Sequence, residues 1–80
     1  MIEVNQYVGI DVSQDTIDVY GEHIGHHKFD NKKKGFKKLL KLIDGRDCCV
    51  MESSGAAHQR LAMFLYEQDV YVSVVNPLTV

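Results

Sequence analysis

The sequence has few of the features that mark fibrous, secreted or membrane-spanning chains. Its 80 residues include 6 glycines and 1 proline, which excludes a collagen-like repeat. No apolar run approaches the roughly 18 residues that a membrane-spanning helix requires, and the opening MIEVNQYVG lacks the basic segment of a signal peptide. Hydrophobic residues make up 45% and the formal net charge is −2, which excludes a disordered chain. We expect one small globular domain, or part of a larger one, that is not associated with a membrane.

Cysteine is also scarce, since the chain has only Cys48 and Cys49. Adjacent cysteines rarely form a disulfide with each other, because the bond needs Cα atoms about 4.4–6.8 Å apart in a geometry that one peptide unit resists. Both lie in an apolar run, so we expect reduced thiols that pack in the interior of a cytoplasmic protein. The histidines do not combine with this pair into a zinc-ligand pattern; they are His23, His26, His27 and His58.

Alternating side chains predict strands in the first third of the chain. Apolar and other residues alternate over 4–13 and again over 16–20, which is the period of two of a half-buried strand. The short polar break between them indicates an antiparallel hairpin. A third short strand is expected over 26–29, after a second break.

The period then changes to that of helices packed on a sheet. The first apolar stripe spans 36–43 with Asn31 as N-cap and Gly45 as the C′ glycine. The second stripe spans 57–65, with Ser53 or Ser54 as its cap. The first stripe consists of Phe36, Leu39, Leu40 and Ile43, and the second of Ala57, Leu61, Phe64 and Leu65. Apolar runs at 48–51 and 70–75 predict two further strands, the last ended by Asn76-Pro77.

The predicted order is therefore β-β-β-α-β-α-β, an α/β fold with a mixed sheet. Strands joined through helices should run parallel with right-handed crossovers. We expect residues 1–80 to be the N-terminal part of a longer catalytic domain, incomplete at the C-terminus, because nothing follows to cover the last strand. Its side chains Val70, Val72 and Val74 should then be exposed and promote self-association.

Two acidic residues stand out against this pattern. Asp11 lies within the first strand, where aspartate is depleted, and Glu52 follows the strand at 48–51. Taken singly, Asp11 is also compatible with a solvent-facing position and Glu52 with a first-turn glutamate that suits the helix dipole. If the two strands are parallel neighbours, the two carboxylates converge at one end of the sheet and need a cation between them. Such hard oxygen ligands suit Mg²⁺ or Mn²⁺ and two-metal phosphoryl transfer.

Lysine is concentrated around the first helix. Three lysines occupy its start, where each cation opposes the helix dipole by about 0.3–1 kcal/mol. A sequence that keeps this cost is expected to use the charge on nucleic-acid phosphates, although a solvated helix face explains the same pattern. The candidate nucleic-acid-binding residues are Lys32, Lys33, Lys34, Lys37 and Lys38, with Lys28 and Lys41 nearby.

Taken in order, several short motifs resemble one family. They are YVGIDVSQDTIDV (7–19), the Phe and Asn of FDN (29–31) with Gly35-Phe36, VMESSG (50–55), LAMFL (61–65) and VVNP (74–77). Their order and spacing resemble the N-terminal half of the RuvC-like DEDD transposases of the Piv/MooV group, insertion-sequence family one-hundred-ten. Ala57 stands where the family usually has an aromatic residue.

The resemblance implies a ribonuclease H-like fold and an enzyme that cleaves and rejoins DNA during insertion-sequence transposition, guided by an RNA. It places the first two catalytic and metal-binding acids on Asp11 and Glu52, with Mg²⁺ or Mn²⁺ as cofactor. The family's other two acids and its nucleophilic serine lie downstream of these 80 residues, so we expect this piece alone to be inactive. The implied partners are DNA, a guide RNA and further copies of the chain.

Two other classes of protein remain compatible with the residues. Actin-like and sugar-kinase ATPases also open with a strand, an aspartate and a hairpin, but their turn favours glycine, whereas the turn here is SQDT. A non-catalytic nucleic-acid interaction module would use the lysine face alone.

Overall fold

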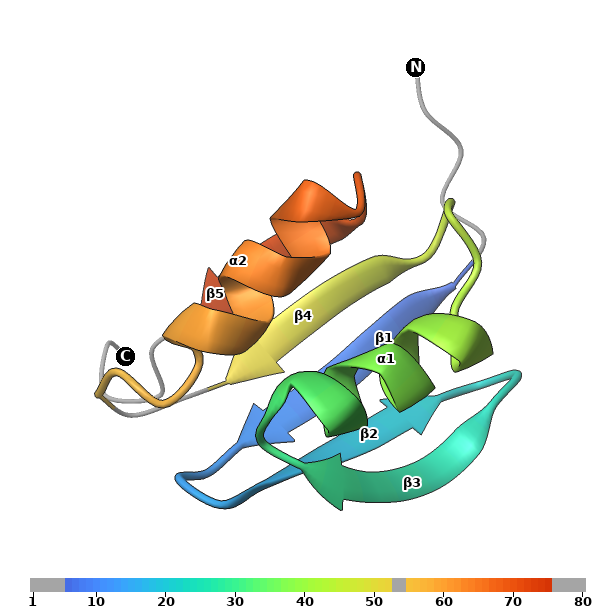
Figure 1. Cartoon of the computed structure of the whole chain (residues 1–80). Helices are drawn as coiled ribbons and strands as arrows, with labels where there is room; N and C mark the ends of the chain where they lie inside the picture. The colour runs from blue at the N-terminus through green and yellow to red at the C-terminus, as the bar shows by residue number, and fades with distance from the viewer. Residues whose placement is uncertain (1–5, 53–54, 76–80) are drawn as a thin grey trace.

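The computed structural model describes residues 6–52 and 55–75 of the chain. Within these ranges seven elements follow in the predicted order (Figure 1). They are β1 (Tyr7–Val12), β2 (Thr16–Gly21), β3 (Gly25–Asp30), α1 (Lys33–Leu42), β4 (Cys48–Glu52), α2 (Gln59–Glu67) and β5 (Tyr71–Val75). The strand boundaries differ from the predicted ones by a few residues, and the predicted stop at Asn76-Pro77 lies outside the described residues.

All five strands form one mixed sheet in the order β3-β2-β1-β4-β5. The hairpin-connected strands are antiparallel, β2 to β1 and β3 to β2. The strands reached through helices are parallel, β4 to β1 and β5 to β4. The α/β class, the mixed sheet and the element order are confirmed, and they are those of a ribonuclease H-like fold.

Both helices cover the same face of this sheet, as Figure 1 shows. Right-handed crossovers require this, because β3 to β4 and β4 to β5 both step in one direction across the sheet. The buried core lies between the helices and this face, with the Phe36 and Phe64 rings 5.6 Å apart at 49°. Its residues are Val8, Ile10, Val12, Ile17, Val19, Phe36, Leu39, Cys49, Met51, Leu61, Ala62, Leu65 and Val70. Val70 is therefore a core residue and Val72 is partly buried, so of the three valines predicted to be exposed only Val74 is, at 41%.

The start of α1 differs from the prediction. Its N-cap is Lys32, whose side chain makes no capping hydrogen bond, and no acidic residue lies in the first turn. Asn31 is not the cap, because its side chain is buried and bonded to other segments, described below. The N-terminal turn nevertheless lies close against β3, since a Cβ at Gly35 would collide with the backbone of Asp30. Glycine at 35 is required by this close approach.

The ends of the helices follow two different patterns. Helix α1 ends at Leu42 with an extended Ile43, so the predicted C′ role of Gly45 is wrong. Helix α2 ends in a Schellman motif: the amides of Asp69 and Val70 donate to Tyr66 and Leu65, with Asp69 at φ 59°.

The cap predicted for α2 also differs from the one observed. The N-cap of α2 is His58, which makes no side-chain capping hydrogen bond. Ser53 and Ser54, the predicted caps, lie outside the described residues.

Candidate active site at the carboxyl end of the sheet

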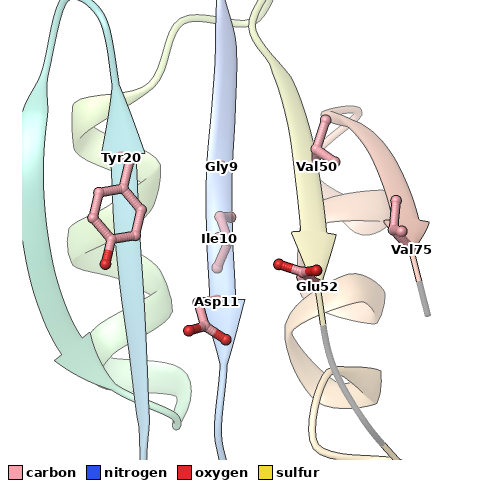
Figure 2. Close-up of a pocket in the computed structure, with 7 residues that line it drawn as sticks. All are labelled: Gly9, Ile10, Asp11, Tyr20, Val50, Glu52 and Val75. Carbon is pink, nitrogen blue, oxygen red and sulfur yellow. The ribbon is translucent and has the colours of Figure 1, made fainter. Parts of the chain in front are cut away.

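Asp11 and Glu52 are direct partners in the parallel pairing of β1 with β4. Strands β1 and β4 are parallel, so both side chains lie at the same end of the sheet, near the carboxyl ends of their strands. Neighbouring strands lie about 4.8 Å apart. Figure 2 shows both carboxylates on the sheet face opposite the helices, on neighbouring strands and near the ends of those strands. The structure thus brings together the two acids that the sequence singled out.

The alternation along each strand explains why these side chains face outward. Val8, Ile10 and Val12 of β1 are buried under the helices, so the residues that alternate with them, Tyr7, Gly9 and Asp11, lie on the open face. In β4, Cys49 and Met51 are buried in the same way, and Glu52 is exposed. A shift of the register by one residue would bury a carboxylate among apolar side chains, which fixes the pairing.

A cavity of about 410 Å³ lies on this open face. It is lined by Gly9, Ile10, Asp11, Tyr20, Val50, Glu52 and Val75. Gly9 is paired with Tyr20 on one side and Val50 on the other, and its lack of a side chain leaves a hollow between them. The two carboxylates therefore border a shallow apolar depression rather than open solvent on all sides.

Tyr20 also lines this cavity and was not among the predicted site residues. The residue is 48% exposed, and its ring stacks on the His26 ring at 4.4 Å between centroids, with 9° between the planes. The period of two did place it on the face of Asp11, through the antiparallel hairpin, so the signal was present. Asp18, the antiparallel partner of Asp11, lies 3.2 Å from Nε2 of His26, an ion pair when His26 is protonated.

The two carboxylates of the site lie on neighbouring strands without a basic partner among the described residues. Among residues 6–52 and 55–75, neither Asp11 nor Glu52 takes part in an ion pair or a side-chain hydrogen bond. Two adjacent carboxylates without a positive partner repel each other, and a divalent ion removes the repulsion. The donors are hard oxygens with room for water ligands on an exposed face, so they fit Mg²⁺ or Mn²⁺. In the same described ranges, no three His, Cys, Asp or Glu side chains gather into a fuller metal site.

The lysines of α1 are exposed but do not form one uniform surface. A cavity of about 360 Å³ at the sheet edge is lined by Lys28 of β3 together with Lys34 and Lys38 of α1. Lys33 instead lines a second cavity, between the two helices, together with Arg60. Lys32, as N-cap, and Lys37 are exposed as well. The first turn of α1 follows the carboxyl end of β3 (Figure 1). Strand β3 runs in the same direction as β1 and β4, whose carboxyl ends carry Asp11 and Glu52.

The two cysteines are free thiols, as predicted. Cys49 is fully buried in the core and Cys48 is partly buried on the other face of β4. Burial, followed by the neighbouring Cys48 and Asp47, raises the pKa of the Cys49 thiol from 9.0 to about 12. The Cys49 thiol is therefore protonated at neutral pH and is a poor nucleophile.

Fold and site together define a class of protein. A five-stranded mixed sheet, with two helices on one face and paired acids at the strand ends of the other, is that of a ribonuclease H-like α/β domain. A model of the IS110-type DEDD transposase family, which is insertion-sequence family one-hundred-ten, matches residues 8–80. The chain belongs to this transposase family, because the match covers nearly all of it.

The match confirms the resemblance inferred from the motifs and supports a DNA transposase function in general. No curated protein matches the chain. Within the part of the chain that the structure describes, no helix is long and apolar enough to cross a membrane.

Proposed function

We propose that Asp11 and Glu52 are metal-binding catalytic acids of a transposase that cleaves and rejoins DNA strands. In this proposal residues 1–80 form the N-terminal part of the catalytic domain, and further acids from outside these residues complete the site. The observation that carries the proposal is the direct pairing of Asp11 with Glu52 on the open face of the sheet.

The chain's own residues would contribute positioning and charge. Asp11 and Glu52 would each direct a carboxylate oxygen at Mg²⁺ or Mn²⁺, on strands whose backbone hydrogen bonds prevent relative sliding. A bound divalent ion supplies activation of the attacking oxygen and stabilisation of the leaving oxygen in phosphoryl transfer. The cavity lies beside the acids, whose side chains are exposed, so a bound ion would keep water among its ligands.

The lysines of α1 would hold the nucleic-acid backbone near this site. Lys32, Lys33 and Lys34 cluster at the uncapped start of the helix, at a cost to helix stability that phosphate contacts would offset. Contacts of lysine with phosphates carry no sequence information, so this surface suits the DNA and a guide RNA equally. Guidance by RNA and assembly into oligomers are part of the proposal on the ground of family membership.

The proposal is tested by DNA cleavage and strand transfer in the complete transposase. Asp11→Asn and Glu52→Gln each keep the size of the side chain and remove its charge. Each should reduce strand cleavage by at least about 10³-fold, because a metal ligand is lost from the reacting centre.

A matched control is Glu22→Gln, which removes one charge from an exposed turn between β2 and β3 at the opposite end of the sheet. It should cleave like the unaltered protein. Cleavage by Asp11→Asn at the rate of this control would overturn the proposal.

A further inference from the structure

We infer that Asn31 is a positioning residue that holds the two carboxylates of the site in register. The inference rests on the proposed role of Asp11 and Glu52 and goes beyond it. Asn31 itself lies between β3 and α1, on neither of the strands that carry the acids. It acts through the two chain segments that leave those strands.

The side-chain amide of Asn31 bonds to both segments at once. Its Nδ2 donates to the carbonyl oxygens of Ser13 at 2.8 Å and Gln14 at 3.4 Å, in the turn that directly follows β1. The same Nδ2 donates to the carbonyl oxygen of Ala57 at 3.1 Å, in the segment between β4 and α2. In addition, the backbone amide of Asn31 donates to the carbonyl of Asp15 at 2.9 Å.

These contacts show which end of the Asn31 amide this position requires. Three carbonyl oxygens surround one –NH₂ group, so only the nitrogen end of the amide satisfies this position. The side chain is 7% exposed, and its Oδ1 is buried without a hydrogen-bond partner among the described residues. A buried acceptor left unpaired lowers the stability of the folded chain. Asn31 therefore serves the surrounding carbonyls through its –NH₂ group, while its own Oδ1 is left without a partner in the part of the chain that the structure describes.

The hydrogen bonds of Asn31 connect the two chain segments that follow the acids. Ser13 follows Asp11 by two residues, and Ala57 follows Glu52 by five, so Asn31 links the chain just beyond each carboxylate. Without the link, two like charges at neighbouring strand ends are free to move apart as those ends fray. With it, the segments are held before a cation arrives, so less ordering is required when the cation binds. Groups hydrogen-bonded directly to metal ligands change metal affinity by about 10–100-fold, and Asn31, which acts through the chain beyond the ligands, should act at the lower end of this range.

The test is Mn²⁺ affinity of the complete transposase, measured by calorimetric titration alongside the thermal midpoint. Asn31→Ala removes the donor, and Asn31→Asp keeps the shape but sets a carboxylate against three carbonyls. Each should weaken Mn²⁺ binding by about tenfold or more. Raising the Mn²⁺ concentration should restore the cleavage rate of Asn31→Ala, because both carboxylates are still present.

Gln6→Ala is the matched control, since Gln6 is also a buried amide that links separate segments. Its Nε2 donates to Oδ2 of Asp47 at 3.0 Å and its Oε1 accepts from the amide of His23, at the opposite end of the sheet. This variant should lower the thermal midpoint while leaving Mn²⁺ affinity unchanged. If Asn31→Ala does not fold, Asn31→Ser, which keeps one short donor, takes its place in the comparison.

These variants distinguish a failure of the proposed metal site from a failure of the positioning role of Asn31. If Asp11→Asn leaves Mn²⁺ affinity intact, the proposed function fails. If Asp11→Asn abolishes binding but the Asn31 variants bind Mn²⁺ as Gln6→Ala does, the positioning role is overturned and the proposed function stands.

Discussion

Single residues on β4 alternate between two chemical environments. Cys49 and Met51 face the helices and are fully buried, whereas Val50 and Glu52 face the cavity on the open side. A thiol and a carboxylate three residues apart therefore have different roles. Cys49 belongs to the core, and Glu52 is available to a ligand.

The raised pKa of Cys49 makes stability depend on alkaline pH. The pKa of its thiol is about 12 in the folded chain, against 9.0 for an ordinary thiol. Below pH 9 the thiol is protonated in both the folded and the unfolded chain, so its contribution to stability is fully present. Between pH 9 and about 12 only the unfolded chain releases the proton, so the free energy of unfolding falls as pH rises. One such thiol contributes a slope of up to about 1.4 kcal/mol per pH unit.

Urea unfolding of the chain and of Cys49→Ala between pH 7.5 and 10.5 isolates this slope, because the other titrating groups are common to both. The difference in stability should be constant below pH 9 and shrink above it. Two parallel pH profiles would show that the Cys49 thiol titrates normally in the folded state.

At the scale of elements, α1 has a poorly capped N-terminus and is nevertheless held in a defined position. Its N-terminus has a lysine cap and no acidic residue, and its first turn is held against β3 by the close approach at Gly35. Packing of Phe36 and Leu39 in the core, rather than capping, keeps this helix in place. The lysines therefore sit at fixed points on the surface instead of on a frayed end.

Their division into two groups leads to a prediction about nucleic-acid binding. Replacing Lys28, Lys34 and Lys38 by glutamine removes the cluster that lines the edge cavity. Replacing Lys33, Lys37 and Lys41 removes the same charge from the rest of the helix. We expect the first set to weaken binding to DNA more, and to flatten the slope of log affinity against log salt by about 0.7–0.9 per lost phosphate contact.

Both triple variants can be measured by fluorescence anisotropy on one labelled duplex over a range of salt concentrations. Equal losses from the two sets would indicate diffuse attraction without a defined edge site. An unchanged slope in both would leave the lysines as a solvated helix face.

At the scale of the whole molecule, the sequence predicted the architecture because its signals are periodic. Alternation over β1 and the apolar run of β4 predicted the two strands, and Asp11 was placed beside Glu52 on the condition that these strands are parallel neighbours, which they are. The helix ends were predicted less well. Asn31 and Gly45 have the residue types of caps, but the tertiary contacts of Asn31 and the extended exit of α1 at Ile43 override those preferences.

The sequence marked Asn31 as a cap and as part of the FDN motif, but it gave no signal for the contacts that Asn31 makes. Its three acceptors are backbone carbonyls, which every residue has, and they come from segments 17, 18 and 26 positions away. Only the folded chain shows that these segments converge. Tyr20, by contrast, was within reach of the sequence, because the hairpin register places it across from Gly9.

The central claim is that Asp11 and Glu52 share a divalent cation, and a double-mutant cycle on metal affinity tests it most directly. Mn²⁺ binding would be titrated calorimetrically in the complete transposase and in Asp11→Asn, Glu52→Gln and the double variant. If the carboxylates act on one ion, each single change should lower affinity nearly as much as both together, because the second ligand gains little without the first. Independent, additive losses, or affinity unchanged in both single variants, would contradict a shared metal site.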